Sequence, residues 1–221
     1  MHIKKHNPII EQLHVIPWTM RKSKSSKGNS FSAVWKKIEK TVSVCTLCSL
    51  SQSRTQTVFG VGNKQAELMI IGEAPGFHED QQGEPFVGRA GQLLTAMMKA
   101  IGFERSDIYI TNILKCRPPQ NRDPHPEEVT LCTPYLDKQI ELVNPRLLLA
   151  VGRIAAHYLL KRTNSLESMR QAIHHYGIHH IPLIVTYHPA YLLRNPNDKK
   201  KAYEDLKFVK KTLAGQSQLS S

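Results

Sequence analysis

The sequence predicts a three-layer α/β/α sandwich, in which a mainly parallel, four-stranded sheet lies between two layers of helices. Four short runs are mostly apolar, as strands of a sheet covered on both faces are. These runs are residues 68–71, 108–114, 147–151 and 181–186. A segment with helical spacing follows each run, and this alternation is typical of parallel sheets with crossover helices. The helical segments are residues 91–101, 126–143, 154–160 and 198–213.

The ends of the chain are expected to lie outside this domain. Residues 1–30 show little regular pattern and include a basic, serine-rich stretch, which predicts a flexible extension and linker. A helix is expected from Phe31, because apolar residues then recur at helical spacing up to Val42. The domain is expected to cover residues 31–215, with the last helix ending at Gly215 and a polar tail at 216–221.

Composition narrows the classes of function. A length of 221 residues allows one domain with extensions, and the formal net charge of +12 favours a polyanionic partner such as nucleic acid. No apolar run approaches the roughly 20 residues of a membrane span, and the N-terminus lacks the apolar core of a signal peptide. A cytoplasmic protein without a membrane partner is therefore expected.

The four cysteines form two pairs. Cys45 and Cys48 make a C-x2-C motif, and Cys116 and Cys132 are separated by fifteen residues. A C-x2-C turn directs two thiolates at one centre, as both zinc and iron–sulfur sites require. The pattern favours one metal or cluster site over four unrelated buried thiols, but the spacing alone does not separate zinc from iron–sulfur.

Polar residues follow three of the predicted strands. Gly72 to Gly76 form a tight, glycine-bearing loop, Asn112 ends the second strand, and His188 follows the last. Because the carboxyl ends of parallel strands meet at one edge of a sheet, these groups should converge on one crevice. Asn112 offers a donor and an acceptor for the edge of a base, although a strand-end turn is the commoner use of asparagine. His188 could equally be a capping group.

Two further features have a functional and a structural interpretation. Phe86 lies between Pro85 and Gly88 on a polar loop, where it is poorly placed for core packing and could stack on a planar ligand. The histidine pairs 174–175 and 179–180 are interpreted as solvated surface, because no carboxylate pattern accompanies them.

Taken together, several stretches resemble the iron–sulfur-containing family 4 of the uracil-DNA glycosylase superfamily. The stretches are GEAPGFHEDQQGEPFVGRAGQLL, YITNILKCRPPQNRDPHPEEVTLC, NPRLLLAVGRIAAHYLL and TYHPAYLLRNP. With the C-x2-C motif they span residues 45–208, and the joint match is far more specific than any single motif. The resemblance implies a DNA repair enzyme that flips uracil out of single- or double-stranded DNA and hydrolyses its N-glycosidic bond. It also implies a monomer.

The resemblance assigns roles to the motifs. It implies a structural [4Fe–4S] cluster held by Cys45, Cys48, Cys116 and Cys132. It implies a uracil pocket lined by the backbone of Glu73, Ala74, Pro75 and Gly76. Within that pocket Phe86 would stack on uracil, Asn112 would pair with its edge, and His188 would bind O2. A leucine after the histidine motif, Leu192 or Leu193, would enter the duplex in place of the flipped base.

Two positions depart from the better-known uracil-DNA glycosylases. Ala74 stands where those enzymes have the aspartate that orients water, which leaves Glu73 or Asn121 for that task. Gly76 stands where they have the tyrosine that blocks the thymine methyl, and Glu79 resembles the family 4 residue that takes over this wall. No KRRIH-type insert for covalent attachment to DNA is present. There are two rival interpretations: a non-catalytic uracil-binding module, and a redox or zinc-ribbon protein. The presence of all the expected pocket residues argues against both.

Overall fold

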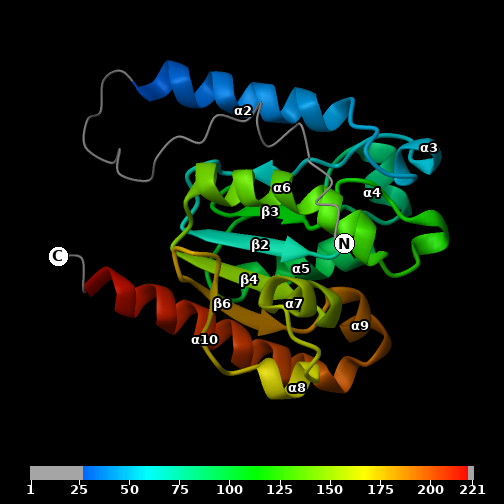
Figure 1. Cartoon of the computed structure of the whole chain (residues 1–221). Helices are drawn as coiled ribbons and strands as arrows, with labels where there is room; N and C mark the ends of the chain where they lie inside the picture. Colours follow the sequence, from blue (N-terminus) through cyan, green and yellow to red (C-terminus); the bar gives the residue numbers. More distant parts are fainter. Residues whose placement is uncertain (1–26, 219–221) are drawn as a thin grey trace, which may run out of the picture.

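The sheet has six strands in the order β1-β3-β2-β4-β6-β5. The computed structural model describes residues 27–218 (Figure 1). Its four central strands are parallel, as predicted: β2 (Leu68–Gly72), β3 (Tyr109–Asn112), β4 (Leu147–Val151) and β6 (Ile181–Thr186). The two edge strands are antiparallel: β1 (Val61–Gly62) and β5 (His174–Tyr176).

The α/β class is confirmed, but the predicted count of four strands is wrong. β1 has only two residues and β5 reads His-His-Tyr, so neither shows the apolar run that identified the central strands. Each edge strand is held by its single neighbour: β1 pairs with β3, and β5 pairs with β6. This pairing is a long-range contact that local periodicity does not reveal.

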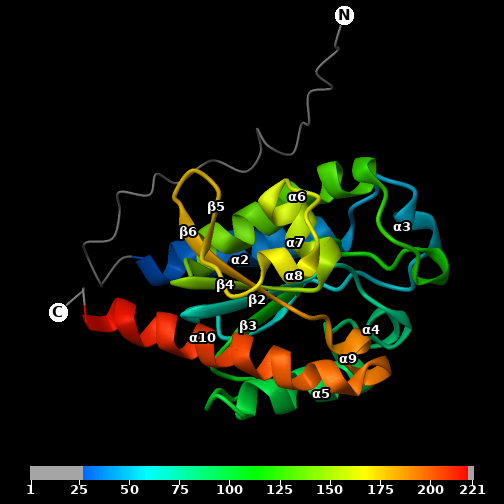
Figure 2. The same ribbon diagram turned by 90° about the horizontal axis from the view of Figure 1, so that it is seen from below.

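Helices cover both faces of the sheet (Figure 2). One face packs against α2 (Lys27–Ser43), α6 (Pro126–Val143) and α7 (Arg153–Leu160). The other face packs against α5 (Arg89–Lys99), α9 (Pro189–Arg194) and α10 (Lys199–Gln218). Within β2, Met69 and Ile71 belong to the first core and Leu68 and Ile70 to the second. This alternation is what a strand buried on both faces requires.

The long helices agree with the predictions except at their ends. Helix α2 begins at Lys27, inside the stretch predicted as linker, and α10 continues to Gln218, beyond the predicted end at Gly215. Six short helical segments were not predicted: α3 (Leu50–Ser53), α4 (Phe77–Gln82), η1 (Pro119–Asn121), α8 (Leu166–Met169), α9 (Pro189–Arg194) and η2 (Pro196–Asp198). The predicted extension at 1–26 and the last three residues of the predicted tail lie outside the described residues.

Trp35 anchors α2 on the sheet. Its ring meets Phe59 and Tyr109 edge-on, with ring centroids 5.6 and 5.4 Å apart. Beyond the end of α2, Cys45 and Cys48 line one pocket together with Lys115 and Cys116 of the loop that follows β3. Within residues 27–218, no helix is long and apolar enough to cross a membrane.

Candidate functional site

A pocket of about 470 Å³ opens at the carboxyl edge of the parallel strands. The register pairs Gly72 with Asn112, so the loop after β2 and the end of β3 lie side by side. The predicted convergence is confirmed, because Asn112, His188 and the whole stretch Glu73-Ala74-Pro75-Gly76 line this one pocket. Other lining residues are Glu79, Phe86, Ala90, Pro118, Asn121, Arg122, Asp123, Ala190, Tyr191 and Arg194.

The side chain of Asn112 carries a buried acceptor that lacks a partner. Its Oδ1 makes no hydrogen bond to any described residue, and the residue is 2 % exposed. Leaving such an acceptor unpaired costs about 1–3 kcal/mol. Glycine at position 72 is required for this placement, because a Cβ there would lie 2.3 Å from Oδ1 and 2.7 Å from Cζ of Phe86. The pocket therefore presents an acceptor that a ligand N–H group can satisfy.

Lys115 holds the backbone beside Asn112. Its Nζ donates to the Asn112 carbonyl and the Thr111 hydroxyl, both at 2.7 Å, and to Oε1 of Gln139 at 2.6 Å. Burial lowers the pKa of Lys115 to about 7, and the nearby Cys132 and Cys116 act against this shift. Lys115 was not predicted as a site residue, although a lysine directly after the apolar Ile113 and Leu114 indicates a buried, paired charge.

His188 is both a capping group and a pocket residue. Its Nδ1 accepts the backbone N–H of Ala190 at 3.1 Å, at the start of α9. A nitrogen that accepts carries no proton, so the neutral ring has its proton on Nε2. Burial, helped by the charge of Arg194, lowers the pKa of His188 to about 4, so the ring is neutral at physiological pH. His188 therefore offers a neutral N–H donor.

Phe86 belongs to the core as well as to the pocket. It is 7 % exposed and packs in the apolar cluster beneath α5 and α9, so the expectation that it is poorly placed for core packing is wrong. Its backbone φ of 55° lies in the left-handed region, which is uncommon for a residue other than glycine. The ring centroid lies 5.8 Å from that of His188. Phe86 and His188 thus stand together in the pocket wall.

Glu79 ties two loops of the pocket together. Its Oε2 accepts the backbone N–H of Gly76 at 3.2 Å, and its Oε1 accepts those of Val87 at 3.0 Å and Gly88 at 3.2 Å. Both carboxylate oxygens are therefore engaged with the backbone. Any exclusion of a methyl group by Glu79 would come from its position in the wall, while its carboxylate holds the loops.

The two candidates for orienting water differ in their surroundings. Burial raises the pKa of Glu73 to about 7; Asp123 adds to the shift and Arg153 opposes it. Asn121 is exposed, and its Oδ1 already accepts Nε of Arg117 at 2.8 Å. Glu73 lines the pocket, and within residues 27–218 no hydrogen bond occupies its carboxylate, in contrast to Oδ1 of Asn121.

The two leucines after His188 are not equivalent. Leu192 is 1 % exposed and packs in the core, which contradicts the expectation that it is available to enter DNA. Leu193 is 37 % exposed and stands beside the pocket-lining Arg194. The helical turn of α9 accounts for the difference, because successive residues point about 100° apart.

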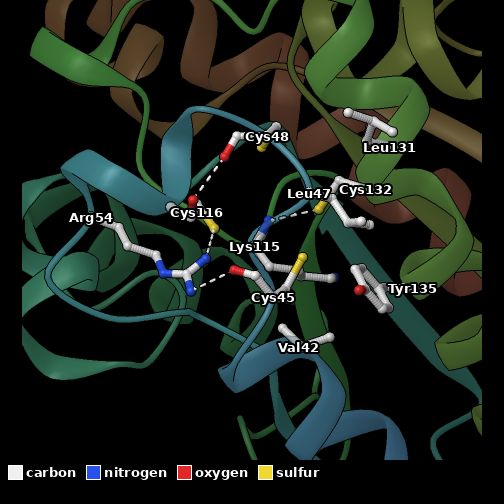
Figure 3. A pocket seen from close by; sticks show the side chains of 11 residues that line it. Val42, Cys45, Leu47, Cys48, Arg54, Lys115, Cys116, Leu131, Cys132 and Tyr135 are labelled. Carbon is white, nitrogen blue, oxygen red and sulfur yellow. Dashed lines mark hydrogen bonds between the residues drawn. The ribbon is translucent and has the colours of Figure 1, made fainter. Parts of the chain in front are cut away.

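The four cysteines line a second pocket, between α2, α3, the loop after β3 and α6 (Figure 3). All four are free thiols. Arg54 donates to Sγ of Cys116 at 3.0 Å and to the carbonyl of Cys45 at 2.7 Å, and the backbone N–H of Lys115 donates to Sγ of Cys132 at 3.3 Å. Such donors stabilise thiolates. Segments far apart in sequence therefore present their sulfur atoms to one apolar space.

Burial raises the pKa of Cys48 and Cys116, and raises that of Cys132 to about 12. The buried hydroxyl of Tyr135, which lines the same pocket, has no hydrogen-bond partner among the described residues. No group of three or more described His, Cys, Asp or Glu side chains is placed to hold a single metal ion. A [4Fe–4S] cluster is larger, and each of its four thiolates binds a different iron.

The histidine pairs lie on the β5–β6 hairpin, away from both pockets. His175, His179 and His180 are exposed, and the half-buried His174 lies with its Nε2 2.7 Å from the carbonyl of Met169.

Comparison with known proteins agrees with this geometry. The model of the uracil DNA glycosylase superfamily matches residues 59–207. A type-4 uracil-DNA glycosylase of Sulfurisphaera tokodaii is 44 % identical over 181 residues, covering 79 % of this chain and 82 % of that protein. One of Saccharolobus solfataricus is 44 % identical (77 % and 82 % covered), and one of Thermotoga maritima is 40 % identical (79 % and 94 % covered). The chain therefore belongs to the uracil DNA glycosylase superfamily and, within it, to the type-4 enzymes.

Proposed function

We propose that this protein is a DNA repair enzyme that flips uracil out of DNA and hydrolyses its N-glycosidic bond, leaving an abasic site. The observation that carries the proposal is the unpartnered Oδ1 of Asn112 in the pocket. Uracil has an N–H group at N3 beside the acceptor O4, so one carboxamide can accept from the first and donate to the second. Cytosine has the opposite pattern and would leave buried groups unpaired.

The remaining pocket residues suit the reaction. Phe86 provides an aromatic face for the base, and Nε2–H of His188 is the donor for O2. When the C1′–N1 bond breaks, its electron pair leaves with uracil, and a donor at O2 is worth most as this charge develops. Water then bonds to C1′ and gives a proton to the Glu73 carboxylate. The uracil anion takes up a proton from solvent, and Glu73 returns its proton to solvent. A neutral His188 stabilises the anion without having to transfer its own proton.

A direct test is the release of uracil from an oligonucleotide with a single uracil, followed as alkali-labile abasic sites. The same oligonucleotide with cytosine or thymine in that position should remain intact. Protein that binds the uracil strand without cleaving it would instead indicate a non-catalytic binding module.

We further propose that Cys45, Cys48, Cys116 and Cys132 hold a [4Fe–4S] cluster. The four thiols line one apolar pocket, Arg54 and the Lys115 amide donate to two of them, and the Tyr135 hydroxyl lacks a partner there. These features fit a bound anionic group. The cluster would cross-link the segment after α2 to α6. The residues of the base pocket, and not the cluster, would carry out the reaction on uracil.

The enzyme is proposed to act on single- and double-stranded DNA as a cytoplasmic monomer. The net charge of +12 supports binding to the phosphate backbone, since each phosphate contact releases counterions. Residues 31–215 are proposed as the catalytic domain, and 1–30 and 216–221 as its extensions.

The activity should depend on the protonation of Glu73. Only the carboxylate can take a proton from water, and the raised pKa keeps Glu73 protonated at pH values below about 7. The single-turnover rate of uracil release is therefore expected to rise through pH 7 and to fall as the pH drops. Glu73→Gln should lower the rate by roughly 10²-fold or more and remove this pH dependence. A rate that falls below pH 7 in Glu73→Gln as in the unmodified enzyme would assign the titration to another group.

Alanine substitutions of Leu192 and Leu193 should have different effects on the opening of duplex DNA. Leu193→Ala is expected to slow uracil release from duplex DNA more than from single strands, because only a duplex must be unpaired and its gap filled. Leu192→Ala should instead lower the free energy of unfolding by about 2–5 kcal/mol, since it empties a core position. The measurement is the ratio of rates on the two DNA forms, with thermal unfolding of both variants. Equal losses on both substrates for Leu193→Ala would rule out insertion.

A further inference from the structure

The rim of the base pocket carries an aromatic side chain that the chemistry on uracil does not use. Phe77 begins α4, directly after the pocket-lining Gly76, and is 52 % exposed. The guanidinium of Arg117 lies over its ring, 5.1 Å from the centroid, and the His78 ring meets it edge-on at 5.5 Å. The exposed ring is thus held in position by two neighbours, one of them from a distant segment.

Its place relative to the pocket distinguishes Phe77 from most exposed apolar residues. Six large hydrophobic side chains are exposed within the described part of the chain: Val44, Phe77, Ile173, Ile178, Leu193 and Tyr203. Of these six, only Phe77 and Leu193 adjoin residues that line the base pocket. They stand on α4 and α9, which lie at the same end of the sheet (Figure 1).

Arg117 adds a positive charge at the same edge. It precedes Pro118, which lines the pocket, and its Nε donates to Oδ1 of the pocket-lining Asn121 at 2.8 Å. Arg117 as a residue is half-buried, so part of it remains open to solvent. An aromatic ring for a base and a cation for the adjoining phosphate are the two elements by which proteins bind single-stranded nucleic acid.

From this arrangement we propose that Phe77 and Arg117 form a subsite for the nucleotide next to the flipped uracil. Its base stacks on Phe77 and its phosphate contacts Arg117. The inference rests on the proposed function, because it starts from a uracil held in the pocket. Phe77 follows the pocket-lining Gly76, which places its exposed ring at the pocket rim, within reach of a base that adjoins the uracil. Unpaired bases have a free face, so the subsite contributes most on single strands.

The test pairs a protein variant with a DNA change. Single-stranded oligonucleotides carry one uracil, and the base on each side of it is replaced in turn by an abasic spacer. In the unmodified enzyme, removing the stacked base should raise the half-saturating concentration for uracil release roughly fivefold or more. Phe77→Ala should cause a similar loss, and the two losses should not add, because they remove the same contact. Phe77→Trp should retain binding, and Phe77→Leu should recover only part.

Controls separate the subsite from general effects. Ile178→Ala changes an exposed apolar residue on the β5–β6 hairpin, at the opposite end of the sheet from α4 and α9 (Figure 2), and should bind every oligonucleotide normally. Arg117→Ala should reduce the salt dependence of binding by the equivalent of roughly one phosphate contact, and Arg117→Lys should keep it. If the losses caused by Phe77→Ala and by the abasic spacer add fully, and the enzyme still releases uracil, the subsite is rejected but the proposed function is kept. Unmodified protein that releases no uracil would reject the proposed function itself.

Discussion

Asn112→Ala is expected to reduce the rate of uracil release by roughly 10²–10³-fold while leaving the protein as stable as before. The variant loses the acceptor for N3–H and the donor for O4, and contacts of this kind are worth several kcal/mol in a buried site. Stability should be kept because Oδ1 makes no hydrogen bond in the free protein. Removing an unpaired buried acceptor relieves a desolvation cost, which offsets the small cavity left by alanine. Single-turnover rates and thermal unfolding measure the two effects.

The neighbouring Thr111 provides the matched control. Its hydroxyl donates to the Phe59 carbonyl at 2.8 Å and accepts from Nζ of Lys115 at 2.7 Å, so it is fully paired. Thr111→Val keeps the shape but removes one hydrogen bond from each partner. The Phe59 carbonyl keeps the bond from Nε2 of Gln139, and Nζ of Lys115 keeps its bonds to the Asn112 carbonyl and to Oε1 of Gln139. The substitution should lower the free energy of unfolding by about 1–3 kcal/mol, with uracil release by the folded protein largely kept. An Asn112→Ala variant that loses stability as Thr111→Val does, with little loss of rate, would assign Asn112 to the structure.

Cys116→Ala is expected to cost the protein its cluster and several kcal/mol of stability. Metal-site formation contributes directly to folding, and here it would join the end of α2 to the loop after β3 and to α6. Anaerobically purified wild-type protein should be brown with about four irons per chain. The variant should be paler, contain less iron, and unfold at a clearly lower temperature. Iron analysis, the visible spectrum and thermal unfolding provide the readouts.

Tyr135→Phe is the companion variant, because it changes the same pocket without removing a ligand. The variant keeps all four thiolates and loses at most one hydrogen bond toward the cluster, so the iron content should stay near that of the wild type and the unfolding temperature should fall far less than in Cys116→Ala. Colourless wild-type protein that contains zinc under these conditions would exclude the cluster. Equal iron content in wild type and Cys116→Ala would exclude Cys116 as a ligand.

The sequence by itself determined the central sheet and the membership of the site. Apolar runs located the four parallel strands because a strand buried on both faces must be apolar throughout. The positions of Gly72, Asn112 and His188 at strand ends then implied one pocket, since parallel strands end at one edge. The edge strands β1 and β5 were missed because their sequences carry no such pattern.

Only the tertiary structure decided what each side chain can do within that site. The tautomer of His188 follows from its bond to Ala190, and the unpaired state of Asn112 follows from neighbours brought together across the sheet. Leu192 and Leu193 are identical in type and adjacent in the chain, yet one is in the core and the other at the surface. Residue type sets the groups available for bonding, whereas burial and partners depend on contacts between segments distant in sequence. These contacts determine which donors, acceptors and apolar surfaces remain free for DNA.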